Sequence, residues 1–184
     1  TVNLFPENIA LLVGSRDIVF AENLRPETAW NAGINATRRF SIGQVRLTAT
    51  ADVYHTRFQN QFFPDYDTDP NRAIIANFTG KSISNGVQVE LSAAWNRRLE
   101  LRVAYNFLDV YRQAAGAETV LLPFNPRHRV LGVATFRTPG ERWQFDANLH
   151  WYGKQRLPDT RSNPEHLRRP DESDPYTVLG VQAR

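Results

Sequence analysis

The most constraining feature of this sequence is a repeated alternation of apolar and polar residues with a period of two. One stretch has apolar positions at Val45, Leu47, Ala49, Ala51 and Val53, each separated from the next by a polar residue, and Val87 to Trp95 repeats the pattern. A β-strand places successive side chains on opposite faces, so each stretch has one apolar and one polar face. The gaps between stretches are alternately long and short, which is typical of a membrane β-barrel.

The alternation predicts about seven antiparallel strands. Their expected ranges are Thr28 to Phe40, a second strand ending near Phe58, a third from about Ala73 or Val87 to Asn96, Leu99 to Tyr111, His128 to Arg137, Trp143 to Gly153, and Tyr176 to Arg184. The long gaps are rich in Pro, Asp and Asn, which form turns and break strands. We therefore expect an all-β fold: an antiparallel, up-and-down, transmembrane β-barrel fragment.

Composition excludes few classes of protein. The chain has 184 residues, of which 41% are hydrophobic and 22% charged, and these values suit a soluble sandwich as well as a barrel. The longest apolar run, Ile9 to Val13, is far shorter than the roughly 20 residues of a spanning helix, so any membrane role must use strands. The net charge is +3 and the arginines are scattered, which argues against a nucleic-acid partner.

Both ends of the sequence have the pattern of a piece of a longer chain. Thr1 to Pro6 has no signal-peptide character, and the strand Tyr176 to Arg184 has no closing turn after it. About seven strands also cannot close the even-numbered barrel of a bacterial outer-membrane protein. We expect residues 1–184 to be a single partial domain of a larger barrel whose closing strand lies outside this chain.

The unequal turns predict an orientation, because outer-membrane barrels have short periplasmic turns and long extracellular loops. Aromatic residues near both strand ends suit two interfacial belts. The belt near the short turns would contain Phe40, Trp95 and Trp143, and the belt near the long loops would contain Tyr54, Phe58, Tyr105, Phe107 and Trp151.

The polar face of the strands is expected to face the lumen, where water or a plug would solvate it. The candidate lumen-facing residues are Asn31, Asn35, Arg46, Asp52, Gln88, Glu90, Arg102, Asn106, Asp146, Asn148 and His150.

Motifs for catalysis, metals or cofactors are incomplete. Gly80-Lys81-Ser82 imitates the end of a phosphate-binding loop, but Ile75 stands where the earlier glycine is required. The acidic run from Asp65 to Asp69 has the spacing of a calcium loop, but Pro70 replaces its glycine. The four histidines lie in four different segments without motif spacing. We therefore predict no enzyme activity, no metal site and no cofactor.

Several short sequence motifs together resemble those of TonB-dependent outer-membrane receptors. They are Asn23-Leu24-Arg25-Pro26-Glu27-Thr28 at a strand entry, the strand end Tyr54 to Gln61, Gly86-Val87-Gln88-Val89-Glu90-Leu91, and the pair Leu122 to His128 and Trp151 to Pro158, which look like a Bacteroidetes-type subset. The resemblance covers nearly the whole chain after residue 20 and identifies it as the C-terminal barrel portion of such a receptor.

The resemblance implies a barrel of about 22 strands with an N-terminal plug domain, which is absent from this chain. It implies TonB-dependent uptake, across the bacterial outer membrane, of a scarce nutrient of the ferric siderophore, cobalamin or glycan class. The implied partners are the receptor's own plug, the TonB complex, a small nutrient ligand, and outer-membrane lipid with lipopolysaccharide.

Ligand contacts are expected in the long loops, where aromatic rings offer stacking surfaces and arginines offer positive charge. The candidates are Phe62, Phe63, Tyr66, Arg72, Arg127, Arg129, Arg161 and Arg168. The same arginines could instead contact lipopolysaccharide phosphates.

Two other classes use the same alternation. A passive channel or adhesin barrel would lack the plug. A soluble antiparallel β-sandwich would bury Trp30 and Trp95 in a core.

Overall fold

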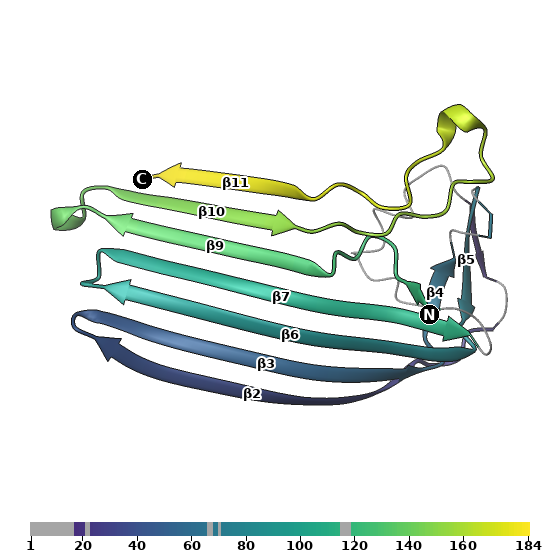
Figure 1. The fold of residues 1–184 in the computed structure, drawn as a ribbon, viewed down its shortest axis with the longest axis horizontal. Helices are drawn as coiled ribbons and strands as arrows, with labels where there is room; N and C mark the ends of the chain where they lie inside the picture. Colours follow the sequence, from purple (N-terminus) through teal and green to yellow (C-terminus); the bar gives the residue numbers. More distant parts are fainter. Residues whose placement is uncertain (1–16, 21–22, 66–67, 70, 115–118) are drawn as a thin grey trace.

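The main sheet is antiparallel and has the up-and-down order that the sequence predicts. The computed structural model describes residues 17–20, 23–65, 68–69, 71–114 and 119–184. The strands of the main sheet are β2 (Thr28–Ile42), β3 (Val45–Gln59), β6 (Gly80–Trp95), β7 (Leu99–Ala114), β9 (His128–Arg137), β10 (Gln144–Tyr152) and β11 (Tyr176–Ala183). They follow the order β11-β10-β9-β7-β6-β3-β2, and β8 (Val120–Leu121) pairs with the outer part of β7 (Figure 1). The predicted barrel-type fold is thereby confirmed.

The alternation located most strand boundaries to within a few residues, but it merged two elements in one region. Residues 72–77 form a separate strand, β5 (Arg72–Asn77), and the long strand of the main sheet begins at Gly80. The prediction that a single strand starts at Ala73 or Val87 was therefore wrong. Gly80 has a φ of 159°, and a Cβ there would collide with the Gln113 carbonyl and the Phe78 ring, so glycine permits the start of β6 to lie close to β7 and to the Phe78 ring.

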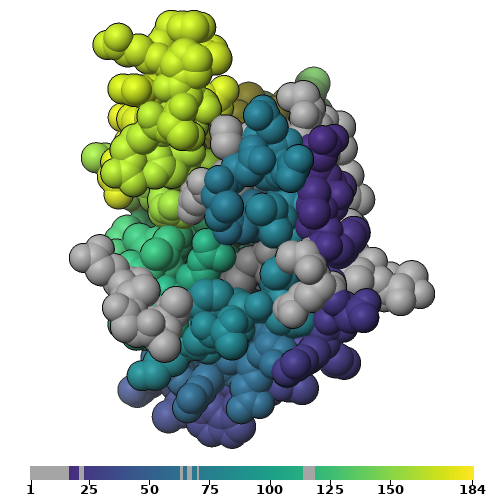
Figure 2. Space-filling model, turned by 90° about the vertical axis from the view of Figure 1, so that its right-hand side faces the viewer, coloured from purple at the N-terminus to yellow at the C-terminus, as the bar shows by residue number. Residues whose placement is uncertain are grey.

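The first long connection folds into a small sheet of its own. Strand β5 pairs in parallel with β1 (Asp17–Phe20) and antiparallel with β4 (Phe62–Asp65). Ala73 and Ile75 on β5 are the buried hydrophobic residues of the described ranges, with 0% and 1% exposure. The small sheet lies at the long-loop end of the molecule, across the ends of the main strands (Figures 1 and 2).

The short turns close hairpins at the opposite end. At the β6–β7 hairpin Asn96 and Arg97 have φ values of 48° and 59°, and the Arg98 N–H donates to the Trp95 carbonyl over 3.0 Å. Two residues with positive φ match the right-handed twist of the flanking strands, as in type I′ turns. Gly43 and Gly140 occupy the same region of φ at the other two short turns.

The outward-facing apolar row has no covering layer in the described residues. Ile34, Leu179 and Val181 are 78%, 68% and 77% exposed, and Trp30 and Trp95 are also exposed. Burying a large apolar side chain is worth roughly 1.5–3 kcal/mol, so a water-soluble protein would cover such a face with a second layer. The sandwich alternative, which requires both tryptophans in a core, was therefore wrong. No helix within the described ranges is long and apolar enough to cross a membrane.

The strand register corrects the predicted outer aromatic belt. Tyr105, Phe107 and Trp151 share the apolar face, but Tyr54 pairs with Gly33 and Gly86 on the polar face. Phe58 lies four residues further along the same strand, and therefore on that polar face too. The assignment of Tyr54 and Phe58 to a lipid-facing belt was wrong, because nearness to a strand end does not fix the face.

Tyr54 lies against a glycine in the middle of the sheet, and this contact predicts a sensitive position. A Cβ at Gly86 would overlap the Tyr54 ring. We expect Gly86→Ala to destabilise the complete barrel by about 1–3 kcal/mol, since the ring must leave its place. The measurement is urea unfolding in lipid vesicles.

Gly132→Ala is the matched control, because a Cβ there would first meet Leu149 at an ordinary 3.9 Å. Tyr54→Ala should relieve most of the cost of Gly86→Ala. Equal destabilisation by the two glycine variants would contradict the proposed steric cause.

Candidate functional site: the polar face and the long-loop end

All eleven candidate lumen-facing residues lie on one face of the sheet. The register aligns Asn35, Asp52, Gln88 and Asn106 side by side across four neighbouring strands. The remaining seven, Asn31, Arg46, Glu90, Arg102, Asp146, Asn148 and His150, follow the same two-residue period on their own strands. The sheet therefore brings together, as one surface, polar residues that are more than a hundred positions apart.

Many of these polar groups satisfy one another across strands. The Asn31 side-chain amide donates to the Thr56 hydroxyl over 2.6 Å. Arg102 Nη2 lies 2.6 Å from Glu90 Oε2, and the Thr135 hydroxyl donates to Asp146 over 2.8 Å. Cross-strand pairs of this kind each stabilise a sheet by a few tenths to about 1 kcal/mol. The polar face is thus an ordered hydrogen-bonding surface.

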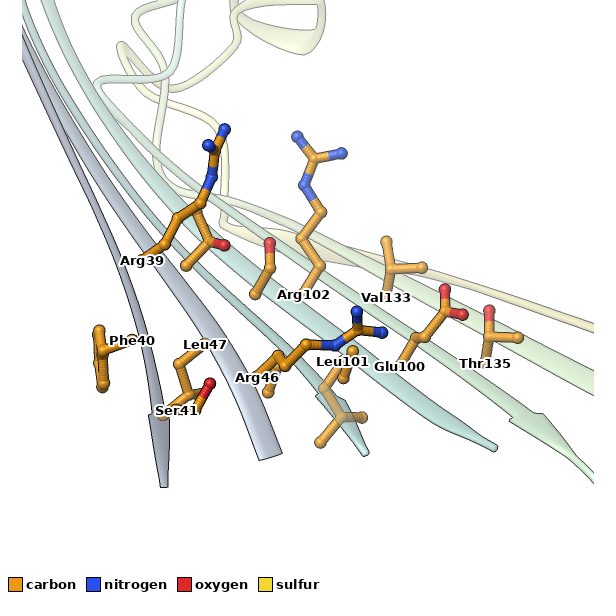
Figure 3. A pocket seen from close by; sticks show the side chains of 14 residues that line it. Arg39, Phe40, Ser41, Arg46, Leu47, Glu100, Leu101, Arg102, Val133 and Thr135 are labelled. Atoms are coloured by element: carbon orange, nitrogen blue, oxygen red, sulfur yellow. The ribbon is translucent and has the colours of Figure 1, made fainter. Parts of the chain in front are cut away.

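A depression of about 640 Å³ lies on this face near the short turns. Its lining includes Arg39, Arg46, Glu100 and Arg102, and Figure 3 shows Arg39 and Arg102 projecting from the same side of the sheet, with Phe40 on the other. Glu100 accepts a hydrogen bond from Arg137, which lies 2.7 Å away. Arg39 and Arg46 form no ion pair with any described residue, so their charges are available to an anionic partner.

An aromatic cluster lies on the same face near the long loops. The rings of Tyr152 and Tyr176 stack at 4.9 Å with an interplanar angle of 23°, and His150 stacks on Tyr152 at 6.3 Å. We call a row of residues that the register aligns across neighbouring strands a level. The level that contains Asn106 continues through Arg129 to Tyr152 and Tyr176. One level of the sheet therefore carries amide, carboxylate, guanidinium and phenol groups together.

Sequence reasoning missed Arg39, Tyr152 and Tyr176. All three follow the polar period of their strands, so the alternation itself was a signal that could have found them. Their significance depends on neighbours from other strands, which the sequence of one strand does not specify.

The candidate loop residues separate into two groups. Phe62 and Arg72 lie in the small sheet, and Arg72 pairs with Asp69 at 3.5 Å. Phe63 lies in β4, whereas Tyr66 falls outside the described residues. The second group, Arg127, Arg129, Arg161 and Arg168, belongs to the region around β9 and the loop after β10.

The arginines of the second group have protein partners. Arg127 forms an ion pair with Asp109, and Arg168 Nε donates to the Asn163 carbonyl over 3.1 Å. Arg129 donates through Nη2 to Asn125 over 2.7 Å, while its Nε is buried and has no partner among the described residues. Arg129 is therefore the member of this group with a donor left to satisfy.

The loop after β10 is braced by main-chain hydrogen bonds. Leu157 N–H donates to the Asp171 carbonyl over 2.8 Å, and Phe124 N–H donates to the Arg156 carbonyl over 2.8 Å, which ties this loop to the connection between β8 and β9. A depression of about 380 Å³ between them includes Arg161 and Asp159 in its lining. Asp159 already compensates the charge of Arg161, so this depression is mixed in charge.

Comparison with known proteins identifies the family. A family model described as TonB dependent receptor-like, beta-barrel, matches residues 4–184. The chain therefore belongs to this family of outer-membrane receptor barrels, as the sequence resemblance predicted. No curated protein gives a significant match.

Two solved structures show the same fold. The FrpB iron transporter from Neisseria meningitidis (F3-3 variant) has a TM-score of 0.58 and 14% identity, covering 90% of this chain and 25% of that one. The ferric-catecholate import receptor Fiu from E. coli K12, in its closed form, has a TM-score of 0.60 and 14% identity, covering 87% and 21%. The chain thus spans a quarter or less of the length of these proteins.

The Asp159–Arg161 pair generates a prediction about titration. The Arg161 guanidinium, with its backbone N–H, holds the pKa of Asp159 at about 2, below the usual 3.8. Arg161→Ala keeps the backbone donor but removes the side chain, so the pKa of Asp159 should rise towards its ordinary value. Carbon-13 NMR of the carboxyl group measures the change.

The sign of the pH effect follows from linkage. An unfolded aspartate has a pKa of about 3.9, so the pair stabilises the loop above about pH 4, and that contribution disappears as the pH falls towards 2. Arg168→Ala is the control, because this arginine donates to Asn163. An Asp159 pKa that stays at about 2 in Arg161→Ala would contradict the assigned cause.

Proposed function

We propose that this chain forms part of the barrel wall of an outer-membrane receptor that imports a scarce nutrient with energy supplied by TonB. The supporting observation is the family match over residues 4–184, together with a sheet that has one ordered polar face and one exposed apolar face. In this proposal the polar face lines the lumen around a plug domain, and the apolar face contacts lipid. The long loops are extracellular and the short turns periplasmic.

The proposed substrate class is a ferric siderophore. The two similar structures are an iron transporter and a ferric-catecholate import receptor. The level of Arg129, Tyr152 and Tyr176 suits an anionic, aromatic iron chelate, since phenol rings stack on planar ligands and a guanidinium donates to oxyanions. The long-loop candidates would form the outer part of the same site.

Uptake of labelled substrates by cells that produce the complete receptor tests this proposal. We expect an iron-55 catecholate chelate to enter only in cells with functional TonB, and cobalamin and oligosaccharides to be excluded. Tyr152→Ala with Tyr176→Ala should weaken chelate binding by about tenfold, because two stacking contacts of roughly 0.5–1.5 kcal/mol each disappear.

Leu179→Ala is the matched control, since this residue lies on β11 with its side chain on the apolar face. The amount of heat-modifiable barrel in the membrane shows whether each variant inserts. Entry of cobalamin or an oligosaccharide instead would contradict the ferric siderophore class. Uptake independent of TonB would favour a passive channel.

The unpaired arginines near the short turns support a plug-facing role for that region. Arg39 and Arg46 would meet carboxylates of the receptor's own plug in the 640 Å³ depression. We expect Arg39→Ala with Arg46→Ala to loosen the plug and increase the entry of large antibiotics such as vancomycin. Growth inhibition measures this leak.

Arg142→Ala is the control for charge, because Arg142 is an exposed arginine in a short turn at the same end of the strands as the depression. An unchanged antibiotic sensitivity in the double variant, with normal barrel levels, would contradict plug contact at this depression.

A further inference from the structure

The outward face changes from apolar to polar at one defined level near the long loops. Ile34, Val53, Val87 and Phe107 form the last apolar level across four strands. The next level carries Ala32, His55, Asn85 and Asp109. The level beyond it is mixed: Trp30 pairs with Arg57, and Ile83 and Tyr111 follow on the next two strands. The end of the apolar band is therefore also the start of a group of polar and cationic side chains.

A depression of about 530 Å³ lies at this boundary, and its lining includes Trp30, His55, Arg57 and Gln59. Trp30 is 64% exposed, and its ring meets the His55 ring edge-on at a centroid distance of 6.2 Å. Ala32 stands opposite His55 in the register, and its small side chain leaves the imidazole uncovered. The depression thus has an aromatic wall, an imidazole and a guanidinium.

The His55 ring in the depression is held in place by a neighbour, and the charge of Arg57 is not neutralised. His55 Nδ1 lies 2.7 Å from Asn85 Oδ1, which holds the ring so that Nε2 points away from this partner. Arg57 is exposed and forms no ion pair or hydrogen bond with a described residue. The nearby carboxylate of Asp109 is already paired with Arg127. The local field around Arg57 therefore favours an anion.

We propose that this depression binds the phosphorylated headgroup of an outer-leaflet glycolipid. The position of the site selects a lipid over a soluble anion, because the site opens on the same face as the apolar band. A lipid seated there would lay its acyl chains along Ile34 and Val53, its phosphate between Arg57 and His55, and its sugar against the Trp30 ring. Basic clusters beside a membrane surface are suited to anionic lipid headgroups. This inference rests on the membrane orientation in the proposed function.

Binding of defined lipids to the purified, complete receptor in detergent tests the site. The probes are bisphosphorylated lipid A, its dephosphorylated form and inorganic phosphate, with native mass spectrometry as the readout. We expect lipid A to bind and both other probes to bind at least about tenfold more weakly, since a charge-assisted hydrogen bond contributes roughly 1.5–3 kcal/mol. Arg57→Ala and His55→Ala should each weaken lipid A binding by a similar factor, and Arg57→Lys should retain part of it.

Arg142→Ala, at the opposite end of the strands, is the matched control and should bind lipid A normally. Equal binding by Arg57→Ala and the unmodified receptor would overturn the assigned site. Equal binding of inorganic phosphate and lipid A would overturn the choice of a lipid.

Photo-crosslinking in cells separates this inference from the proposed function. A photoreactive residue in place of Gln59 should capture lipopolysaccharide, whether or not the receptor imports an iron chelate. Capture of periplasmic-leaflet phospholipid instead would overturn the inference together with its orientation. Capture of lipopolysaccharide without TonB-dependent uptake would support the lipid site and contradict the proposed transport function.

Discussion

Cross-strand register is the constraint on which the rest of this structure depends. A strand in hydrocarbon must pair every backbone donor and acceptor with a neighbouring strand, because lipid offers no hydrogen bonds. Side chains alternate with a period of two, so a slip of one residue would exchange the faces of a whole strand. The match of Ile34 with Val53 and of Asn35 with Asp52 shows that pairing and amphipathic pattern agree across the sheet.

The two faces then have separate physical roles. On the polar face, cross-strand contacts such as Arg102 with Glu90 hold side chains in fixed positions. The charges that lack an ion-pair partner among the described residues, Arg39 and Arg46, are the places where another molecule or domain would add stability. On the apolar face, the transition to Trp30 and Arg57 marks the level at which lipid chains would give way to headgroups.

The strand order, the unequal connections and the polar set of eleven residues were predictable, because period-two alternation is a local property of each strand. The small sheet was not, since β1 and β5 pair in parallel from distant segments and β5 resembles a continuation of β6. Tyr54 shows a second limit. Its place beside Gly86 depends on the facing strand, whereas proximity to a strand end suggested a lipid-facing belt.

The sequence by itself determined the class of fold, the alternation of faces and the family, because each follows from the periodicity and the short sequence motifs of single strands. Tertiary structure decided which side chains share a level. The joining of Arg129 with Tyr152 and Tyr176, the depression around Arg39 and Arg46, and the pairing of Trp30 with Arg57 all come from the register between strands. Register is set by hydrogen bonding and packing between segments, and the sequence of one strand does not contain its partner.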